Sequence, residues 1–156
     1  LAERMNVDRK EAKELIDGYF ETYPSVKAYM EKSIQIAQEK GYVETIFHRK
    51  RFLPDINSRN AVVRGYAERN AINAPIQGSA ADIIKVAMAR IYQRFQTEGI
   101  QAKMILQVHD ELNFSVPVNE KERVEEIVIE EMEHAYRMHV PLKADCGWGK
   151  NWLEAH

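Results

Sequence analysis

Apolar residues in the first forty positions recur every three or four residues, which is the spacing of one helix face. Two helices are therefore predicted. The first is capped by Asp8, and the second ends near Gly41. The segment Thr22-Tyr23-Pro24 is expected to separate them, because proline cannot continue a helix that precedes it. The apolar face of the first helix comprises Ala12, Leu15, Ile16 and Tyr19.

The rest of the chain mixes helical spacing with the alternation typical of strands. Pro75 is expected to end one helix, Ser79 and Asp82 to form a capping box for the next, and Asn119 to cap a third. The expected elements are a hairpin of residues 42–46 and 51–53, helices 58–74 and 79–98, strands 104–108 and 112–116, a helix 119–136 and a strand 142–146. This order predicts an α+β fold, with helices packed on a small antiparallel sheet that includes the last strand.

Length and composition limit the class of protein. The 156 residues suit one domain or parts of two. No run approaches the roughly 20 apolar residues that span a membrane, and Leu1-Ala2-Glu3-Arg4 is unlike a signal peptide, so we expect no membrane partner. The chain lacks an initiator Met, which suggests a piece cut from a longer protein. Cys146 is the single cysteine, which excludes an internal disulfide and fits a reducing cytoplasm.

Formal charge is unevenly distributed, although the whole chain carries only −2. Residues 40–103 hold 11 Lys and Arg and 5 Asp and Glu, a balance of +6. Residues 104–156 hold 5 Lys and Arg and 11 Asp and Glu, a balance of −6. Because polyanions bind local basic surfaces, residues 40–103 are the candidate contact with nucleic acid. A helical protein with scattered charges and no such partner explains these numbers equally well.

Two acidic residues occupy the tip of the predicted hairpin 104–116, in the segment Val108-His109-Asp110-Glu111-Leu112. Such tips usually carry Asn-Gly or Asp-Gly, because those residues tolerate positive φ. Carboxylates at a rigid strand end suit Mg²⁺, which takes one or two of them and leaves its other positions for water and phosphates. Asp110 and Glu111 are therefore candidate metal ligands, with His109 beside them. A solvated acidic turn is the alternative.

Three polar residues form a second candidate site. Arg69 and Asn73 are four residues apart and share a helix face, and Gln77 continues that line in sequence, with its direction left open by Pro75. Such a row can hydrogen-bond the acceptors of a duplex minor groove without reading much sequence. A polar face with local side-chain hydrogen bonds is the alternative.

A compact basic segment, His48-Arg49-Lys50-Arg51, forms the third candidate site. It lies at the tip of the hairpin predicted for residues 42–53. Arg49, Lys50 and Arg51 could hold phosphate groups. A solvated loop is the alternative.

Four segments resemble motifs of family A DNA polymerases and occur in that family's order. They are GYVET (41–45) with LPD (53–55), NAPIQGSAAD (73–82), VHDE (108–111) and GKNWLEAH (149–156). The first resembles the hairpin between fingers and palm, the third the last catalytic motif, and the fourth the natural C-terminus. His48 departs from the family, whose members usually carry Gly there. Together these motifs span nearly the whole chain.

The resemblance implies a role for each candidate residue. Asp110 would be a metal-binding catalytic aspartate, Glu111 would support it, and His109 would lie near the primer terminus. Primer–template DNA would be contacted by Arg69, Asn73 and Gln77, and its backbone by Arg49, Lys50 and Arg51. The expected reaction is template-directed transfer of nucleotides from deoxynucleoside triphosphates, assisted by two Mg²⁺ ions.

The resemblance also implies what this chain lacks. The second catalytic aspartate and the nucleotide-binding helix would precede Leu1. Residues 1–55 would then be the end of the fingers and 56–156 the C-terminal part of the palm, with the upstream polymerase as partner. The isolated chain is expected to fold without polymerising. Two other functions stay open: a non-catalytic DNA-binding module, and an unrelated metal-dependent phosphodiesterase, which an assay of the isolated chain would identify.

Overall fold

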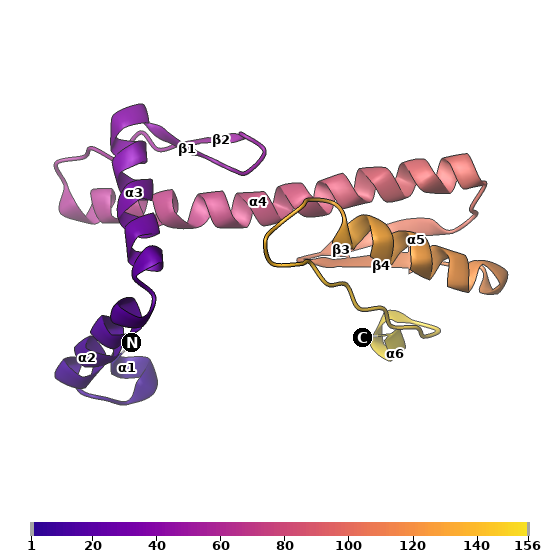
Figure 1. Ribbon diagram of the computed structural model, residues 1–156, viewed down its shortest axis with the longest axis horizontal. Coiled ribbons are helices and arrows are strands. Elements are labelled where there is room, and N and C mark those ends of the chain that lie inside the picture. The colour runs from indigo at the N-terminus through magenta and orange to yellow at the C-terminus, as the bar shows by residue number, and fades with distance from the viewer. Residues whose placement is uncertain (1, 156) are drawn as a thin grey trace. The chain divides into compact units, whose positions relative to one another are not determined.

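The computed structural model describes residues 2–155, and its contacts divide the chain into two compact units, Leu1–Ile76 and Gln77–His156. Each unit is described by itself. The first contains α1 (Ala2–Met5), α2 (Arg9–Thr22), α3 (Pro24–Lys40), β1 (Tyr42–Glu44), β2 (Lys50–Phe52) and the first part of α4 (Ala61–Glu98) (Figure 1). The second contains the rest of α4, β3 (Lys103–Val108), β4 (Glu111–Ser115), a 3-10 turn η1 (Val118–Glu120), α5 (Lys121–Glu133) and α6 (Trp152–Ala155).

Local capping explains the start of α2 and the end of α3. The Asp8 carboxylate accepts hydrogen bonds from the amides of Lys10 and Glu11, each at 2.8 Å, and so caps α2. At the end of α3, Gly41 adopts a left-handed conformation with φ of 76°, which glycine reaches at little cost. The two predicted helices, their caps and the break before Pro24 are confirmed.

The first unit has its own small core. Strands β1 and β2 pair in antiparallel fashion, with Tyr42 opposite Phe52 and Glu44 opposite Lys50, which confirms the predicted hairpin. The core joins α3, this hairpin region and the first part of α4. It consists of Ala37, Val43, Leu53, Ile56, Ala67 and Ala71.

Helix α4 corrects two of the sequence predictions. Pro75 lies inside it, so residues 58–74 and 79–98 do not form separate helices, and Ser79 with Asp82 caps no helix start. The start is capped instead by Asn60, whose side-chain oxygen accepts from the amides of Val62 and Val63. An interior proline removes one helix hydrogen bond and costs about 3 kcal/mol. Nearby, the Tyr29 hydroxyl donates to the carbonyl of Ile72 at 3.3 Å. Burial of α4 residues in both packing clusters works against the cost of the proline.

The second unit packs two helices on one hairpin. Strands β3 and β4 pair in antiparallel fashion, with a register irregularity between Met104 and Leu106. Their inner face and both helices contribute to a single buried cluster. Its fully or nearly buried members are Ala87, Ile91 and Phe95 of α4, Ala102, Val124 and Ile127 of α5, and Ala135. The rings of Phe95 and Phe114 meet edge to face at 5.9 Å.

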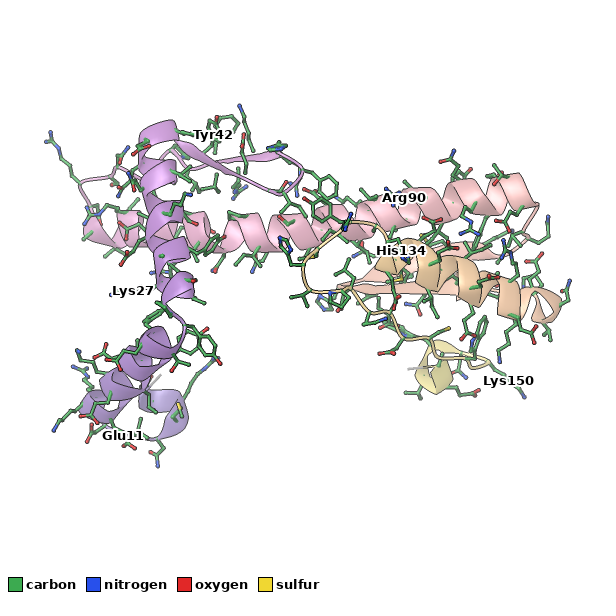
Figure 2. The ribbon with its side chains drawn as sticks, in the orientation of Figure 1. Glu11, Lys27, Tyr42, Arg90, His134 and Lys150 are labelled. Carbon is green, nitrogen blue, oxygen red and sulfur yellow. The ribbon has the colours of Figure 1, made fainter. Side chains whose placement is uncertain are left out.

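Polar contacts reinforce the packing of α4 on α5. The Arg90 guanidinium donates to the carbonyl of His134 at 2.9 Å; Figure 2 labels both residues. One helical turn further along α4, Arg94 pairs with Glu130 at 2.6 Å and with Glu131 at 3.2 Å. These bonds fix α5 against the part of α4 that lies in the same unit.

Three predictions for the C-terminal region are wrong in detail. Asn119 lies within η1, and α5 begins after Glu120, whose carboxylate instead accepts from the amides of Gln101 and Ala102 at 2.9–3.0 Å. That helix ends at Glu133 rather than near 136. Residues 142–146 form no strand, and the sheet has two strands, β3 and β4. A strand requires a partner for its backbone groups, and the described residues place none beside this segment.

The overall class nevertheless agrees with the sequence prediction. Helices combined with two small antiparallel sheets confirm an α+β fold. Within residues 2–155, every helix is too short or too polar to cross a membrane.

Candidate metal and nucleic-acid site

A strained two-residue turn joins β3 to β4. Val108 pairs with Glu111, so His109 and Asp110 alone form the loop. His109 has a positive φ of 53° and Asp110 does not, which is the sign pattern of a type II′ turn, whose first position usually belongs to glycine. The Gln107 amide donates to the carbonyl of His109 at 2.6 Å and braces this conformation. Backbone strain of this kind is concentrated at functional sites.

The two acidic residues of the turn have different surroundings. Asp110 is exposed, and its carboxylate has no hydrogen bond or ion pair with any of residues 2–155. Glu111 is half-buried, and its Oε1 accepts a hydrogen bond of 2.7 Å from the indole Nε1 of Trp152. Asp110 is therefore available to a cation, while Glu111 is held by a neutral donor.

A cavity of about 530 Å³ brings three of the predicted site residues together within the second unit. Gln77 of α4 lines it together with the turn residues His109 and Asp110. Small and aliphatic side chains of α4 form much of its wall, and Lys143 contributes a cation from the extended segment that follows α5. Its lining thus combines apolar walls with a few polar groups, which is typical of binding sites.

A second cavity, of about 570 Å³, borders the same turn. It is lined by Asp110, Glu111, strand β4, helix α5 and residues 143–149. Asp110 borders both cavities, and so does Lys143. The carboxylate at the turn is consequently accessible from two directions.

Contacts with α5 hold the C-terminal segment beside the turn. Glu133 accepts from the amide of Ala144 at 3.2 Å and lies 3.6 Å from the ammonium of Lys143. Further on, the indole of Trp148 donates to Glu125 at 2.7 Å. Lys143 and Trp152 were not predicted as site residues, because their partners lie far from them in sequence.

The donor set at the turn fits a magnesium ion in part. Asp110 and Glu111 supply adjacent carboxylates, and Mg²⁺ binds through one or two carboxylates with water and phosphate oxygens completing its shell. Among residues 2–155, no group of three or more His, Cys, Asp or Glu side chains converges as a metal site. The turn can hold one side of a hydrated ion, and further ligands must come from substrate or from other protein segments.

The other two residues of the predicted polar row lie in the first unit. Arg69 and Asn73 are exposed on α4, and the Arg69 guanidinium lies 5.9 Å from the ring centroid of Tyr66, in a cation–π contact. Arg69, Asn73 and Gln77 follow one another at four-residue intervals along the same helix, because α4 continues through Pro75. Their role in DNA contact stays a prediction.

The basic segment runs from the tip of the β1–β2 hairpin into strand β2. Arg49, Lys50 and Arg51 are exposed, and the Lys50 ammonium lies 4.4 Å from the ring centroid of Tyr42. The Thr45 hydroxyl organises the tip by accepting from the amides of Phe47 and Arg49. His48 adopts a φ of 61°, a conformation that suits glycine, so the unusual residue is accommodated at a conformational cost. The tip can bind phosphates, and this too stays a prediction.

Comparisons with known proteins agree on one family. The profile of "DNA polymerase family A" matches residues 1–154. DNA polymerase I of Bacillus caldotenax is 54% identical over 155 residues, covering 99% of this chain and 18% of the relative. The Bacillus subtilis enzyme is 49% identical with the same coverage. The solved POL domain of Pol1 from M. smegmatis, in complex with DNA primer-template and dNTP, matches with a TM-score of 0.97 and 42% identity, over 99% of this chain and 27% of that one. This chain thus spans about a fifth of the length of these curated relatives.

Proposed function

Because this chain belongs to DNA polymerase family A, we propose that it forms part of a DNA-directed DNA polymerase and supplies Asp110 as one catalytic carboxylate. The observation that carries this proposal is the strained turn at His109 and Asp110, which lines one cavity together with Gln77. The activity belongs to the larger protein, since the chain covers only 18% of its polymerase relatives. The relatives are bacterial, and the cytoplasm, where the bacterial chromosome lies, is the proposed location.

Each residue of the turn has a distinct part in this function. Asp110 presents an unpaired carboxylate where a hydrated cation can meet phosphate oxygens. Glu111 adds a second negative charge beside it, and His109 places its side chain next to the cavity that Gln77 lines. Family A polymerases are generally metal-dependent. Two Mg²⁺ ions, when bound, would activate the primer 3′-hydroxyl and stabilise the pyrophosphate leaving group.

Exposed basic and amide side chains of the chain suit the second part of the function, which is holding primer–template DNA. Arg69, Asn73 and Gln77 lie along one helix and can donate to minor-groove acceptors, which are nearly the same for all base pairs. The exposed hairpin tip of residues 49–51 can bind the phosphate backbone. This matches the description of the M. smegmatis relative, which is complexed with primer-template DNA and dNTP.

We assign residues 1–55 to the end of the fingers and residues 56–156 to the C-terminal part of the palm. Helix α4, which contributes to both packing cores, then belongs wholly to the palm part. The upstream polymerase chain would supply the second catalytic aspartate and the helix that binds the incoming nucleotide.

The test is Asp110→Asn in the complete polymerase. Loss of one metal-binding charge should reduce nucleotide incorporation on the order of 10³-fold or more, while primer–template affinity stays within about twofold. Glu122→Gln, which removes an exposed carboxylate from α5, is the matched control and should behave as wild type. Near-normal incorporation by Asp110→Asn would refute the catalytic assignment. If DNA binding persisted and the wild-type protein also failed to incorporate nucleotides, a non-catalytic DNA-binding module would be the better description.

A further inference from the structure

The C-terminal helix contacts the acidic turn directly. The indole Nε1 of Trp152, in α6, donates a hydrogen bond of 2.7 Å to Oε1 of Glu111. These residues are 41 positions apart in sequence, so the contact depends on how the C-terminal segment folds back within the second unit. Glu111 is also the residue of β4 that closes the hairpin by pairing with Val108.

The segment that carries Trp152 is itself anchored. Trp148 donates to Glu125 of α5 at 2.7 Å, and the Lys121 ammonium lies 4.9 Å from the centre of its ring. The short helix α6 is held by reciprocal bonds between Asn151 and Glu154: the Glu154 amide donates to Asn151 at 3.1 Å, and the Asn151 side chain donates to Glu154 at 2.9 Å. Trp152 therefore has a defined place from which to act on the turn.

The chemistry of the donor suits a carboxylate beside a metal site. An indole N–H can only donate, and it carries no charge. It can orient the Glu111 carboxylate without neutralising it, whereas a Lys or Arg in the same place would compete with a cation for the negative charge. Hydrogen bonds from such outer partners commonly fix the carboxylates of metal sites. A glutamate side chain has several rotatable torsions, and the bond from Trp152 is one restraint that keeps its carboxylate in place.

We propose that Trp152 is a positioning residue for the metal-binding turn, holding the Glu111 carboxylate beside Asp110 through its indole N–H. This inference rests on the proposed polymerase function. It gives the extreme C-terminal helix a role in the active site, although α6 contains none of the expected ligands. Trp152 acts through Glu111 and contacts neither the metal nor the substrate in this assignment.

The test compares Trp152→Phe with Trp148→Phe in the complete polymerase. Both substitutions remove an indole N–H and keep an aromatic ring in the same segment, and only the first removes a bond to the turn. Trp152→Phe should raise the Mg²⁺ concentration needed for half-maximal incorporation about tenfold. This is the lower end of the effect of residues that hydrogen-bond a metal ligand, and we expect the lower end because Trp152 is 47% exposed. The incorporation rate at saturating Mg²⁺ and primer–template affinity should stay near wild type.

A second measurement does not depend on activity. Hydrogen–deuterium exchange of peptides covering residues 107–112 should accelerate in Trp152→Phe and not in Trp148→Phe. In a Glu111→Ala background, Trp152→Phe should add no further change, since the acceptor is already gone. Equal effects of the two tryptophan substitutions would show a general loosening of the C-terminal segment and overturn the proposal.

The outcomes also separate this inference from the proposed function. If Asp110→Asn abolishes incorporation while Trp152→Phe changes neither the Mg²⁺ dependence nor the exchange, the polymerase assignment stands and the positioning role is refuted. If Asp110→Asn incorporates normally, the proposed function fails. If, in that case, Trp152→Phe also leaves the Mg²⁺ dependence unchanged, the positioning role is refuted too. This holds even if hydrogen–deuterium exchange of residues 107–112 accelerates in that variant.

Discussion

Ile91→Ala tests whether the core that supports the acidic turn is packed as described. Ile91 lies on α4, is 0% exposed and belongs to the cluster that joins α4, α5 and the β3–β4 hairpin. The substitution deletes three buried carbon atoms, worth about 2.4 kcal/mol at roughly 0.8 kcal/mol each. The cavity left behind adds to this loss, so the free energy of unfolding should fall by about 3–4 kcal/mol, within the range of about 2–5 observed for such truncations.

The assay can follow the second unit alone. Both tryptophans of the chain, Trp148 and Trp152, lie in that unit, so their fluorescence during urea denaturation reports its unfolding. Ile105→Ala is the matched control: it makes the same chemical change on β3, where the side chain is 64% exposed, and should cost less than about 1 kcal/mol. The dependence of free energy on urea concentration should be alike in both variants. A loss below about 1 kcal/mol for Ile91→Ala, or one no larger than that of the control, would refute the described packing of α4 and α5 on the hairpin.

Two further predictions concern charge and DNA contact. A hydrogen bond from Arg94 holds the pKa of Glu130 below its ordinary value of 4.5, so this contact stabilises the fold above that pH and is lost as pH falls through the lowered pKa. Glu130→Gln should therefore make stability less dependent on pH below about 4.5. Unfolding followed by tryptophan fluorescence between pH 7 and 3 measures this. The same pH dependence in the variant and the wild type would contradict the ion pair. Gln77→Ala in the complete polymerase should weaken extension of a paired primer to a similar degree for all four terminal base pairs, because minor-groove acceptors are nearly degenerate. Steady-state kinetics on the four primers is the measurement, and a loss of extension confined to one terminal base pair would contradict the assignment.

Local signals in the sequence were sufficient for the first unit's helix ends and hairpin. Asp8 and Gly41 act through bonds and backbone angles within a few residues, so their effects could be predicted from neighbouring positions. The effect of Pro75 could not be predicted in this way, because its tolerance inside α4 depends on the packing of that helix against segments distant in sequence. Propensity for breaking a helix was overridden there by tertiary contacts.

The segment after α5 shows a second limit of sequence prediction. Leu142 and Ala144 are half-buried and Lys143 and Asp145 are exposed, so the alternation typical of a strand is present. Within the described residues, however, no strand forms a hydrogen-bond ladder with this segment. The prediction failed because alternation indicates which side chains are buried, and not whether a neighbouring strand exists. Its amide at Ala144 bonds to the side chain of Glu133 instead.

The candidate site was predictable in its composition and not in its surroundings. Local chemistry left Asp110 and Glu111 as candidate metal ligands, with a solvated acidic turn as the alternative, and the resemblance to family A DNA polymerases decided between the two. Lys143 and Trp152 could not be predicted, since each reaches the site through a fold that returns to the turn after some 30 to 40 residues. Gln77 reaches the same cavity because α4 does not end at Pro75.

Many carboxylates in the acidic C-terminal half of the chain have hydrogen-bond or ion-pair partners inside the second unit. Those with side-chain or backbone partners include Glu120, Glu125, Glu126, Glu130, Glu131, Glu133 and Glu154. Ion pairs with Arg94, Arg123 and Lys143 offset part of this negative charge, whereas the carboxylates that accept only from neutral donors keep theirs. Asp110 differs from them, because it has no such partner among residues 2–155 and borders both cavities. Among the acidic residues of this unit, Asp110 combines an exposed side chain with a place in the lining of both cavities, so a cation could reach its carboxylate there.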